Sequence, residues 1–368
     1  MTTAEDAALH SRPLLTVDLG AITANWQALS RIASPAEAAA VVKANAYGLG
    51  VKRVAPALWA AGARTFFVAL PREGAELRGI LGPAATIYVF NGFMPADTEI
   101  FAANDLRPCL NSLQQIRDLQ SALHAMHETP KVGLHIESGI NRLGLTSDDL
   151  DRLRIDRAPG LNITLIMSHL AMADAPSNGM NTRQRGAFAG RAALLRAVAP
   201  NARMSLAATG GTLLGDQFHF DLVRPGVGLY GGAPFAAARP VVTLEAPLIQ
   251  VRKVPAGETV GYGATWTARR DSRIGVLPIG YADGFFRTHK NAKVFLHGRA
   301  ASVVGRVSMD MITVDLTDHA DVAPGMMLEI LGPHQSVDQL AASAGTIGYE
   351  VLTALGARFA RRYTDADA

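Results

Sequence analysis

The sequence has very little cysteine, since Cys109 is the only one among 368 residues. One cysteine cannot form an intrachain disulfide or a zinc site built from several thiolates. Cys109 stands in Arg-Pro-Cys-Leu-Asn, a stretch typical of a strand end. We therefore expect it to be a small buried residue rather than a nucleophile, and we predict no metal site.

An excess of one charge and long apolar runs are also lacking. The chain has 35 basic and 32 acidic residues, a net charge of +3, and no cluster of Lys and Arg, so nucleic acid is not an expected partner. No apolar run reaches the length of a membrane span. The first residues, Met-Thr-Thr-Ala-Glu-Asp, lack the basic and apolar regions of a signal peptide. These features predict a cytoplasmic protein with no membrane partner.

What the chain does contain is a series of short apolar segments separated by polar or helical stretches. Continuous apolar runs are typical of parallel strands buried on both faces. Eight β–α units over 200–250 residues predict an α/β fold, a (β/α)8 TIM-type barrel. An open doubly wound sheet is the alternative, but no Gly-x-Gly-x-x-Gly follows the first strand. The eight predicted strands are Ala38–Lys43, Thr65–Leu70, Thr86–Phe90, Leu106–Leu110, Lys131–Glu137, Ile163–His169, Met204–Ala208 and Val223–Tyr230.

The pattern changes near Pro240, after which short strand candidates alternate with Gly, Pro and charged turns. This predicts a separate C-terminal domain, mostly antiparallel β. We place the barrel at 13–239 and the β domain at 240–368, and residues 1–19 could pack with the latter. The strands predicted there are Val241–Val254, Ile274–Ile279, Lys293–Leu296, Ala301–Val304, Met311–Val314 and Met327–Ile330.

Lys43 ends the first predicted strand, directly before a turn that contains Tyr47, Gly48 and Gly50. A lysine at such a position can lose enough solvent to act as a nucleophilic amine. The simpler interpretation is that Lys43 only brings the strand out to solvent. The polar residues at the ends of other strands favour the interpretation of Lys43 as a nucleophile.

Polar residues follow several other strands at the pole of the barrel where active sites lie. Glu137 and Arg142 follow the fifth strand, His169 ends the sixth, and Thr209–Thr212 follows the seventh. Each has an ordinary explanation alone. Arg142 would form a surface ion pair, His169 would be a hydrogen-bonded core histidine, and the glycines of 209–212 would form an ordinary turn. Loops after strands seven and eight commonly bind phosphate on this fold. A reactive lysine beside a phosphate loop fits an enzyme that uses pyridoxal 5'-phosphate (PLP).

Arg224, in the eighth segment, bears on the reaction. An arginine facing the pyridine nitrogen of PLP would disfavour protonation of that nitrogen. The ring would then withdraw electron density from the substrate's α-carbon less strongly. Return of a proton to the α-carbon would be favoured over transamination. Racemisation would be the natural outcome.

Seven motifs in chain order carry a resemblance over both domains. They are Val-Lys-Ala-Asn-Ala-Tyr-Gly-Leu-Gly (42–50), Ser-Gly-Ile-Asn-Arg-Leu-Gly (138–144), Ser-His-Leu-Ala (168–171), Val-Arg-Pro-Gly-Val-Gly-Leu-Tyr-Gly (223–231), Val-Gly-Tyr-Gly-Ala-Thr-Trp (260–266), Pro-Ile-Gly-Tyr-Ala-Asp-Gly (278–284) and Gly-Arg-Val-Ser-Met-Asp-Met (305–311). With these motifs the whole chain resembles the PLP-dependent, barrel-type alanine racemases.

The resemblance implies two catalytic bases on opposite faces of the substrate. Lys43 would bind PLP as a Schiff base and act on the D-enantiomer, and Tyr262 of a partner subunit would act on the L-enantiomer. Racemisation requires such a pair, because a proton leaves one face and returns to the other. A tyrosine, with an ordinary pKa near ~10, needs help from cationic neighbours such as His169. Without the motif, packing in the β domain would be the expected role of Tyr262 and Tyr281.

The resemblance also implies two sets of binding residues and two departures from the family. PLP would be held by Lys43, Tyr47, His169, Thr209, Gly210, Arg224, Gly226, Val227 and Tyr349. The substrate would be bound by Arg142, the backbone of Met309, and Tyr281. His135 replaces the lysine, often carbamylated, that orients the arginine in many relatives. Thr209-Gly210 replaces a frequent Asn-Ser pair, so Thr209 or Thr212 would supply the hydroxyl.

The function implied is interconversion of L-alanine and D-alanine by a homodimer with shared active sites, supplying D-alanine for peptidoglycan. The alternative is a racemase of broader specificity, acting on serine or lysine. A PLP-dependent decarboxylase is a second alternative, against which Arg224 argues. A PLP-carrier protein made of the barrel alone is a third, and it would need neither a second domain nor Tyr262.

Overall fold

The computed structural model describes residues 12–126, 129–155 and 160–364. The prediction for residues 1–19 therefore falls largely outside the described residues. The chain divides into two compact units. Among the described residues, one is formed by 12–21 together with 239–364, and the other by Ile22–Ala238.

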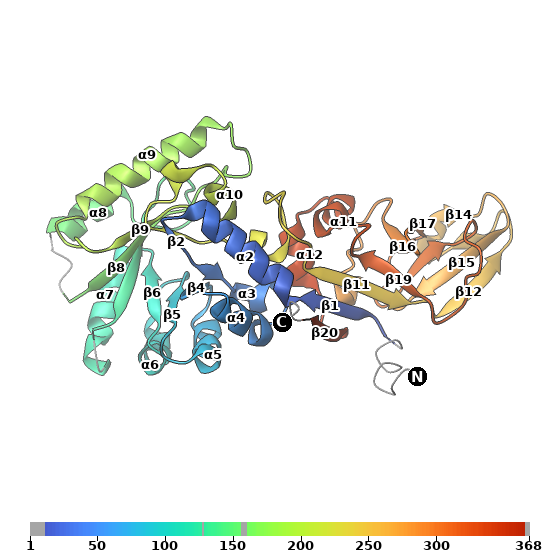
Figure 1. The fold of residues 1–368 in the computed structure, drawn as a ribbon, viewed down its shortest axis with the longest axis horizontal. Coiled ribbons are helices and arrows are strands. Elements are labelled where there is room, and N and C mark those ends of the chain that lie inside the picture. The colour runs from blue at the N-terminus through green and yellow to red at the C-terminus, as the bar shows by residue number, and fades with distance from the viewer. Residues whose placement is uncertain (1–11, 127–128, 156–159, 365–368) are drawn as a thin grey trace. The chain divides into compact units, whose positions relative to one another are not determined.

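The unit Ile22–Ala238 is built around parallel strands that pair in chain order (Figure 1). Seven of them, β3 to β9, form one sheet, and β10 pairs in parallel with β2. Backbone hydrogen bonds close the ring: Ala39 N donates to Val223 O at 2.9 Å, and Arg224 N donates to Ala207 O at 2.8 Å. The predicted (β/α)8 barrel is confirmed, with β2 and β3 together as its first strand. The strands are β2 (Glu37–Ala38), β3 (Ala40–Val41), β4 (Thr65–Val68), β5 (Thr86–Val89), β6 (Arg107–Leu110), β7 (Lys131–His135), β8 (Asn162–Met167), β9 (Arg203–Ser205) and β10 (Leu222–Val223).

Helices alternate with these strands and cover the outside of the ring (Figure 1). The buried residues of α4 are Val51, Val54, Ala55 and Leu58, the spacing of one apolar helix face. Ser112 caps α7 by accepting a hydrogen bond from Gln115 N. The helices are α2 (Leu19–Ala33), α3 (Lys43–Tyr47), α4 (Val51–Ala60), α5 (Pro71–Leu81), α6 (Thr98–Ala103), α7 (Leu113–Ala122), α8 (Ser147–Ile155), α9 (Gly179–Leu194) and α10 (Thr209–Thr212).

Two segments near the phosphate-loop candidate differ from the prediction. The eighth strand ends at Val223, and Val227–Tyr230 forms a 3-10 turn. Pro225 has no N–H to donate to a neighbouring strand, which explains why the apolar run does not continue as a strand. Thr209–Thr212, predicted as a loop, forms one short helical turn.

The other unit contains a nine-stranded sheet in the order β12-β15-β18-β17-β16-β19-β11-β1-β20. Its pairs are antiparallel except β1 with β20, so the predicted, mostly antiparallel β domain is confirmed. The strands are β1 (Leu14–Asp18), β11 (Val242–Pro247), β12 (Gln250–Val254), β15 (Ser272–Leu277), β16 (Lys293–Leu296), β17 (Arg299–Val304), β18 (Ile312–Asp315), β19 (Met327–Leu331) and β20 (Ala360–Thr364), joined by the hairpin β13 (Thr259–Val260) and β14 (Trp266–Thr267) and helices α11 (Val337–Ala344) and α12 (Gly348–Ala354).

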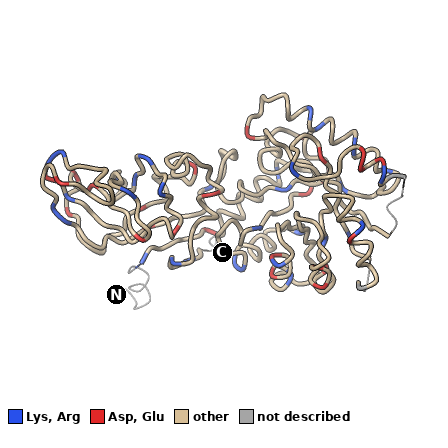
Figure 2. Tube along the Cα trace, turned by 180° about the vertical axis from the view of Figure 1, so that it is seen from behind, with Lys and Arg blue, Asp and Glu red and all other residues tan. Residues whose placement is uncertain are grey.

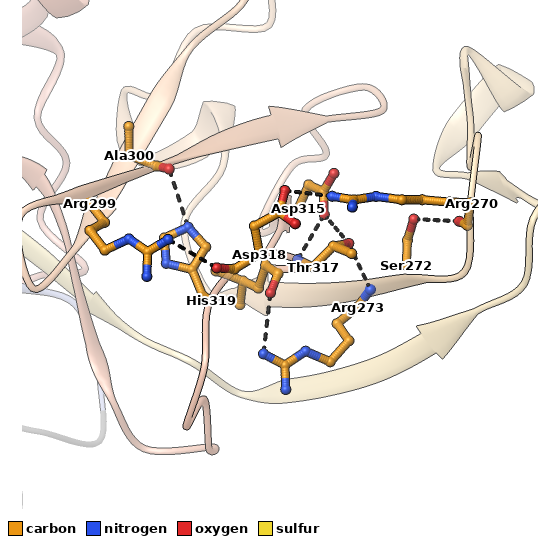
Figure 3. A network of polar contacts seen from close by, with 10 residues as sticks. Arg270, Ser272, Arg273, Arg299, Ala300, Asp315, Thr317, Asp318 and His319 are labelled. Atoms are coloured by element: carbon orange, nitrogen blue, oxygen red, sulfur yellow. Dashed lines mark hydrogen bonds and ion pairs between the residues drawn. The ribbon is translucent and has the colours of Figure 1, made fainter.

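Basic and acidic residues are interspersed along the chain trace of each unit (Figure 2). Figure 3 shows one network of the β unit, in which exposed Arg270 pairs with exposed Asp318 at 2.5 Å and half-buried Thr317 donates to half-buried Asp315. Exposed pairs of this kind add little stability. Among the described residues, no helix is long and apolar enough to span a membrane.

Candidate active site

Lys43 lies at the carboxyl end of β3, where the prediction placed it. It is half-buried, and its Nζ lies 5.9 Å from the centre of the Phe90 ring. Burial lowers the pKa of Lys43, and the nearby charge of Arg142 lowers it further, while Glu73 acts in the opposite direction. A larger fraction of the amine is therefore unprotonated than in an ordinary lysine, as nucleophilic chemistry requires.

The turn after Lys43 is left-handed, which the sequence did not predict. Ala44, Asn45, Ala46 and Tyr47 have φ values of 52°, 56°, 54° and 54°. Non-glycine residues adopt this conformation at a cost of about 1–2 kcal/mol each. Such strain persists where surrounding contacts enforce it, typically at functional sites.

Two side chains hold this left-handed turn by accepting backbone hydrogen bonds. Glu73 Oε1 accepts from Ala44 N at 2.6 Å, and Asn45 Oδ1 accepts from Val51 N at 2.8 Å. Asn45 tolerates a left-handed backbone better than most residues. Glu73 is a site residue that sequence reasoning missed, because nothing local links it to a turn 29 positions away.

Arg224 is buried in the barrel, with 2% of its surface exposed. Its guanidinium donates to Ser168 O at 2.6 Å, to Leu206 O at 3.4 Å and to Ser205 Oγ. All three are neutral acceptors, and burial lowers the pKa of Arg224 to about 10. The side chain is therefore a fixed positive charge held by dipoles rather than by a carboxylate.

Two histidines near Arg224 are neutral. Burial, then the charges of Arg224 and Arg142, lower the pKa of His169 to about 3 and that of His135 to about 4. Both rings are uncharged at pH 7. His169 is therefore not the cationic neighbour that the sequence analysis expected, because burial dominates its titration.

His135 is oriented by Asn111, a second residue that sequence reasoning missed. The amide nitrogen of Asn111 donates to Phe90 O and Cys109 O, so its Oδ1 faces His135 Nδ1 at 2.7 Å. His135 Nδ1 must then carry the proton. His135 Nε2 is left as a buried acceptor without a hydrogen-bond partner among the described residues.

The phosphate-loop candidate is tied together by Thr209. Its buried Oγ1 accepts from Gly226 N at 3.0 Å and Gly228 N at 3.2 Å, which leaves its own proton to donate. Thr212, by contrast, already donates to Ala208 O. Of the two hydroxyls, Thr209 is the one with a hydrogen atom left for a ligand.

Close approaches explain why glycine stands at two predicted positions in this region. A Cβ on Gly226 would lie 2.3 Å from Tyr47 Oη, and one on Gly210 would lie 2.9 Å from Ala173 Cβ. The ring of Tyr47 stacks on Tyr230, whose hydroxyl donates to Val41 O at 3.0 Å. The neighbouring Val227 is buried.

Arg142 lies in a tight loop after β7 and is exposed. Glu137 closes this loop by accepting hydrogen bonds from Gly139 N and, at 2.9 Å, from Asn141 N. A Cβ on Gly144 would lie 2.6 Å from Glu137 N, so the return to Leu145 requires glycine. The loop thus presents Arg142 at the end of β7.

This end of the barrel is suited to a reactive anion. It combines the partly desolvated amine of Lys43 with the charges of Arg142 and Arg224, and the acid that acts on Lys43 is Glu73. The hydroxyl proton of Thr209 adds a donor. A phosphate-bearing group that reacts with an amine fits these residues.

The remaining predicted residues belong to the β unit and are largely exposed. Tyr262 is 71% exposed at the tip of the β13–β14 hairpin. Met309 is 54% exposed and Tyr281 43%. Tyr349 is half-buried on α12.

The segments that carry Tyr281 and Met309 are joined to each other. Tyr281 N donates to Ser308 O at 3.1 Å, and Ala282 N donates to Met309 O at 3.0 Å. A Cβ on Gly280 would lie 2.3 Å from Met309 O. The carbonyl of Met309 is thus occupied, whereas its N–H makes no hydrogen bond within the described part of the chain.

Family models account for nearly the whole chain. The model for the alanine racemase N-terminal domain matches residues 17–234, and that for the C-terminal domain matches residues 241–363. The chain belongs to the alanine racemase family. The resemblance predicted from its motifs is confirmed.

Individual members of the alanine racemase family are similar over nearly their full length. An alanine racemase from Jannaschia sp. is 50% identical over 351 residues, which cover 95% of this chain and 98% of that protein. One from Cereibacter sphaeroides is 49% identical over 354 residues, covering 95% and 97%. The crystal structure of the Bartonella henselae alanine racemase, with covalently bound PLP, superposes with a TM-score of 0.91 at 37% identity, covering 96% of this chain and 99% of that one.

Proposed function

We propose that this chain interconverts L-alanine and D-alanine by a two-base mechanism, with Lys43 and Tyr262 of a partner subunit as the bases. As a member of the alanine racemase family it is a PLP-dependent isomerase. The observation that carries the assignment of roles is the partly desolvated amine of Lys43 at a barrel end lined by Arg142 and Arg224. We further propose that the D-alanine serves peptidoglycan synthesis.

The residues of the barrel fit PLP. Lys43 would hold it covalently, and the hydroxyl of Thr209 and the segments of Gly210, Gly226 and Val227 would bind its phosphate. Tyr47, which packs over Gly226, would border the phosphate on one side, and Tyr349 would add its hydroxyl. When bound, PLP withdraws electrons from the α-carbon of an amino acid and makes its proton acidic.

Arg224 would set how strongly those electrons are withdrawn. It is a fixed charge held by Ser168 O and Ser205 Oγ, and placed against the ring nitrogen it would keep that nitrogen unprotonated. Neutral His169 would not compete for this role. The arrangement favours return of the proton to the α-carbon.

The two bases would act from opposite faces of the α-carbon. The lowered pKa of Lys43 lets its amine accept a proton on the face of the D-enantiomer. Tyr262 stands at the tip of a hairpin with 71% of its surface exposed, as expected of a side chain that reaches into the site of a partner subunit. Exposed Met309 and Met311 support burial of this surface by a second copy.

Three groups would bind the substrate. The guanidinium of Arg142 and the N–H of Met309 would bind its carboxylate, because both are donors without hydrogen-bond partners among the described residues. Tyr281 would narrow the entrance to the size of alanine. A wider site would instead accept serine or lysine, the alternative left by the sequence.

The test is incubation of the purified, PLP-loaded protein with L-alanine, L-serine and L-lysine in D2O. We expect racemisation of alanine with deuterium at the α-carbon, and much slower reaction of the other two. Comparable rates for all three would replace the proposal with the broader racemase. A folded, PLP-treated sample without a cofactor absorbance band would refute both.

A further inference from the structure

The left-handed turn of Ala44–Tyr47 is fixed from outside itself. The amide of Ala44, the first peptide after Lys43, donates to Glu73 Oε1 at 2.6 Å. Ala44 is exposed, so burial does not protect this amide from solvent. Glu73 lies in the first turn of α5, after the next strand of the barrel.

The two carboxylate oxygens of Glu73 bind different segments. Oε1 binds the turn after Lys43, and Oε2 accepts from Ala69 N at 2.8 Å and Leu70 N at 3.0 Å, at the junction of β4 and α5. Three backbone N–H groups therefore converge on one side chain. The carboxylate ties the lysine-bearing turn to the neighbouring β–α unit.

We propose that Glu73 is a positioning residue that holds the backbone of the Lys43 turn in its left-handed conformation and supplies the negative charge beside the Lys43 amine. The proposal rests on the proposed role of Lys43 as the residue that binds PLP. Glu73 is not a base in the reaction. It acts through Lys43, by fixing the backbone from which that side chain projects.

The chemistry of this position requires a carboxylate of this length. Glutamine has one acceptor oxygen, so its amide N–H2 would face either Ala44 N or the N–H groups of Ala69 and Leu70. Aspartate keeps the charge but is one methylene shorter, so it cannot bind both segments at their present separation. Glutamate alone meets both requirements.

Glu73 also balances the charges around Lys43. Burial and Arg142 lower the pKa of the lysine, and the Lys43 charge in turn acts on His169. Glu73 is the group that raises the pKa of Lys43. Without it, the amine would face Arg142 with no opposing charge from the residues that the structure describes.

The geometric part is tested by amide hydrogen exchange of the full chain without cofactor. In Glu73→Gln we expect Ala44 or the Ala69–Leu70 pair to exchange about tenfold faster or more, because the charged hydrogen bonds are lost. Glu76→Gln is the matched control, since it removes the same charge from the same helix, where Glu76 faces Lys52 at 3.9 Å. Unchanged exchange at all three amides in Glu73→Gln would overturn the role of Glu73 in positioning the backbone.

The electrostatic part is tested by the pH dependence of acetylation of the Lys43 amine, with exposed Lys253 of β12 as the internal reference. Glu73→Gln should lower the midpoint for Lys43, and Glu76→Gln should not. Glu73→Asp should speed exchange at Ala44 but move the midpoint less, because the charge remains. An equal midpoint in the wild-type and Glu73→Gln proteins would overturn the charge role.

Neither measurement needs bound PLP or turnover. A wild-type chain without racemase activity would refute the proposed function while both results on Glu73 could still be obtained. Conversely, the wild-type enzyme could be active while Glu73→Gln shows the same exchange and acetylation as the wild-type protein. That result would refute only this inference. In the loaded enzyme, we expect Glu73→Gln to shift the pH at which the cofactor's absorbance band changes, and Glu76→Gln to leave it unchanged.

Discussion

The two units hold their candidate site residues in opposite ways. In the barrel, Lys43 stands on a left-handed turn and Arg224 is buried against neutral acceptors. In the β unit, Tyr262 and Met309 are exposed. Arg358 pairs there with buried Asp283 and exposed Asp310, which lie in the segments of Tyr281 and Met309. The barrel places its candidate residues on a run of left-handed non-glycine residues and beside a buried arginine held by neutral acceptors, whereas the β unit displays its candidate residues on a surface tied by charge pairs.

This difference shows what each unit contributes. Strained backbone and buried charges held by fixed dipoles are typical of a binding site that is organised in advance of its ligand. Exposed aromatic and methionine side chains on rigid segments are instead typical of surfaces that another chain covers. The barrel therefore supplies the binding site, and the β unit supplies side chains whose counterpart we expect in a second copy.

The largest expected effect comes from mixing two inactive variants. Lys43→Ala and Tyr262→Phe should each lose about a thousandfold or more of the activity, because each lacks one of the two bases. In a hybrid dimer, one site would combine both defects and the other would have neither. Random re-association of equal amounts should then restore about a quarter of wild-type activity.

Two controls define this mixing experiment. Each variant re-associated with itself should stay inactive, and Tyr262→Phe should still bind PLP with an unchanged absorbance band. No recovery in a mixture shown to contain hybrids would mean that both bases come from one chain. Loss of PLP from Tyr262→Phe would mean that this tyrosine has been assigned the wrong role.

The barrel and Lys43 could be predicted because their determinants are local. Continuous apolar runs such as Thr86–Val89 mark buried parallel strands, and Lys43 directly follows one of them. Four of the seven motifs, moreover, lie at the strand ends where this fold places its active site.

What escaped prediction depends on contacts distant in sequence. The handedness of the Lys43 turn depends on Glu73, and the neutrality of His169 depends on burial and on Arg224. The strand β20, Ala-Arg-Arg-Tyr-Thr, has no apolar alternation and forms because β1, from the other end of the chain, pairs with it. No local pattern carries that information.

The acid stability of the cofactor-free chain sharpens the comparison further. The pKa values of His169 and His135, about 3 and about 4, lie below the ordinary value of 6.5. As pH falls below 6.5 the unfolded chain binds protons that the folded barrel does not, so stability is lost until the folded pKa values are reached. Down to pH 4.5, each histidine should account for on the order of 2–3 kcal/mol of this loss.

Urea unfolding at pH 7 and pH 4.5 measures this dependence. His135→Asn or His169→Asn should reduce the difference between the two pH values, because one group that titrates differently in the two states is gone. His124→Asn, at an exposed position, is the control and should leave the difference unchanged. An unaltered pH dependence in both barrel variants would show that these histidines do not set acid stability.

The smallest effect is expected in the β unit, from the charge pairs that join the segment of Tyr281 to the segment of Met309. Arg358 binds both oxygens of Asp283, at 2.7 and 2.8 Å, and one oxygen of Asp310 at 2.6 Å.

Arg358→Met should loosen the segments of Tyr281 and Met309 and raise KM for alanine roughly tenfold, with a smaller change in kcat, because binding geometry rather than the bases is disturbed. PLP affinity should change little, since every residue assigned to hold the cofactor except Tyr349 lies in the barrel. Arg362→Met removes a neighbouring exposed arginine that contacts Thr16 instead, and should have no effect. A wild-type KM in Arg358→Met would mean that Tyr281 and Met309 keep their positions without the charge pairs. Lost PLP would mean that these charge pairs support the cofactor site as well.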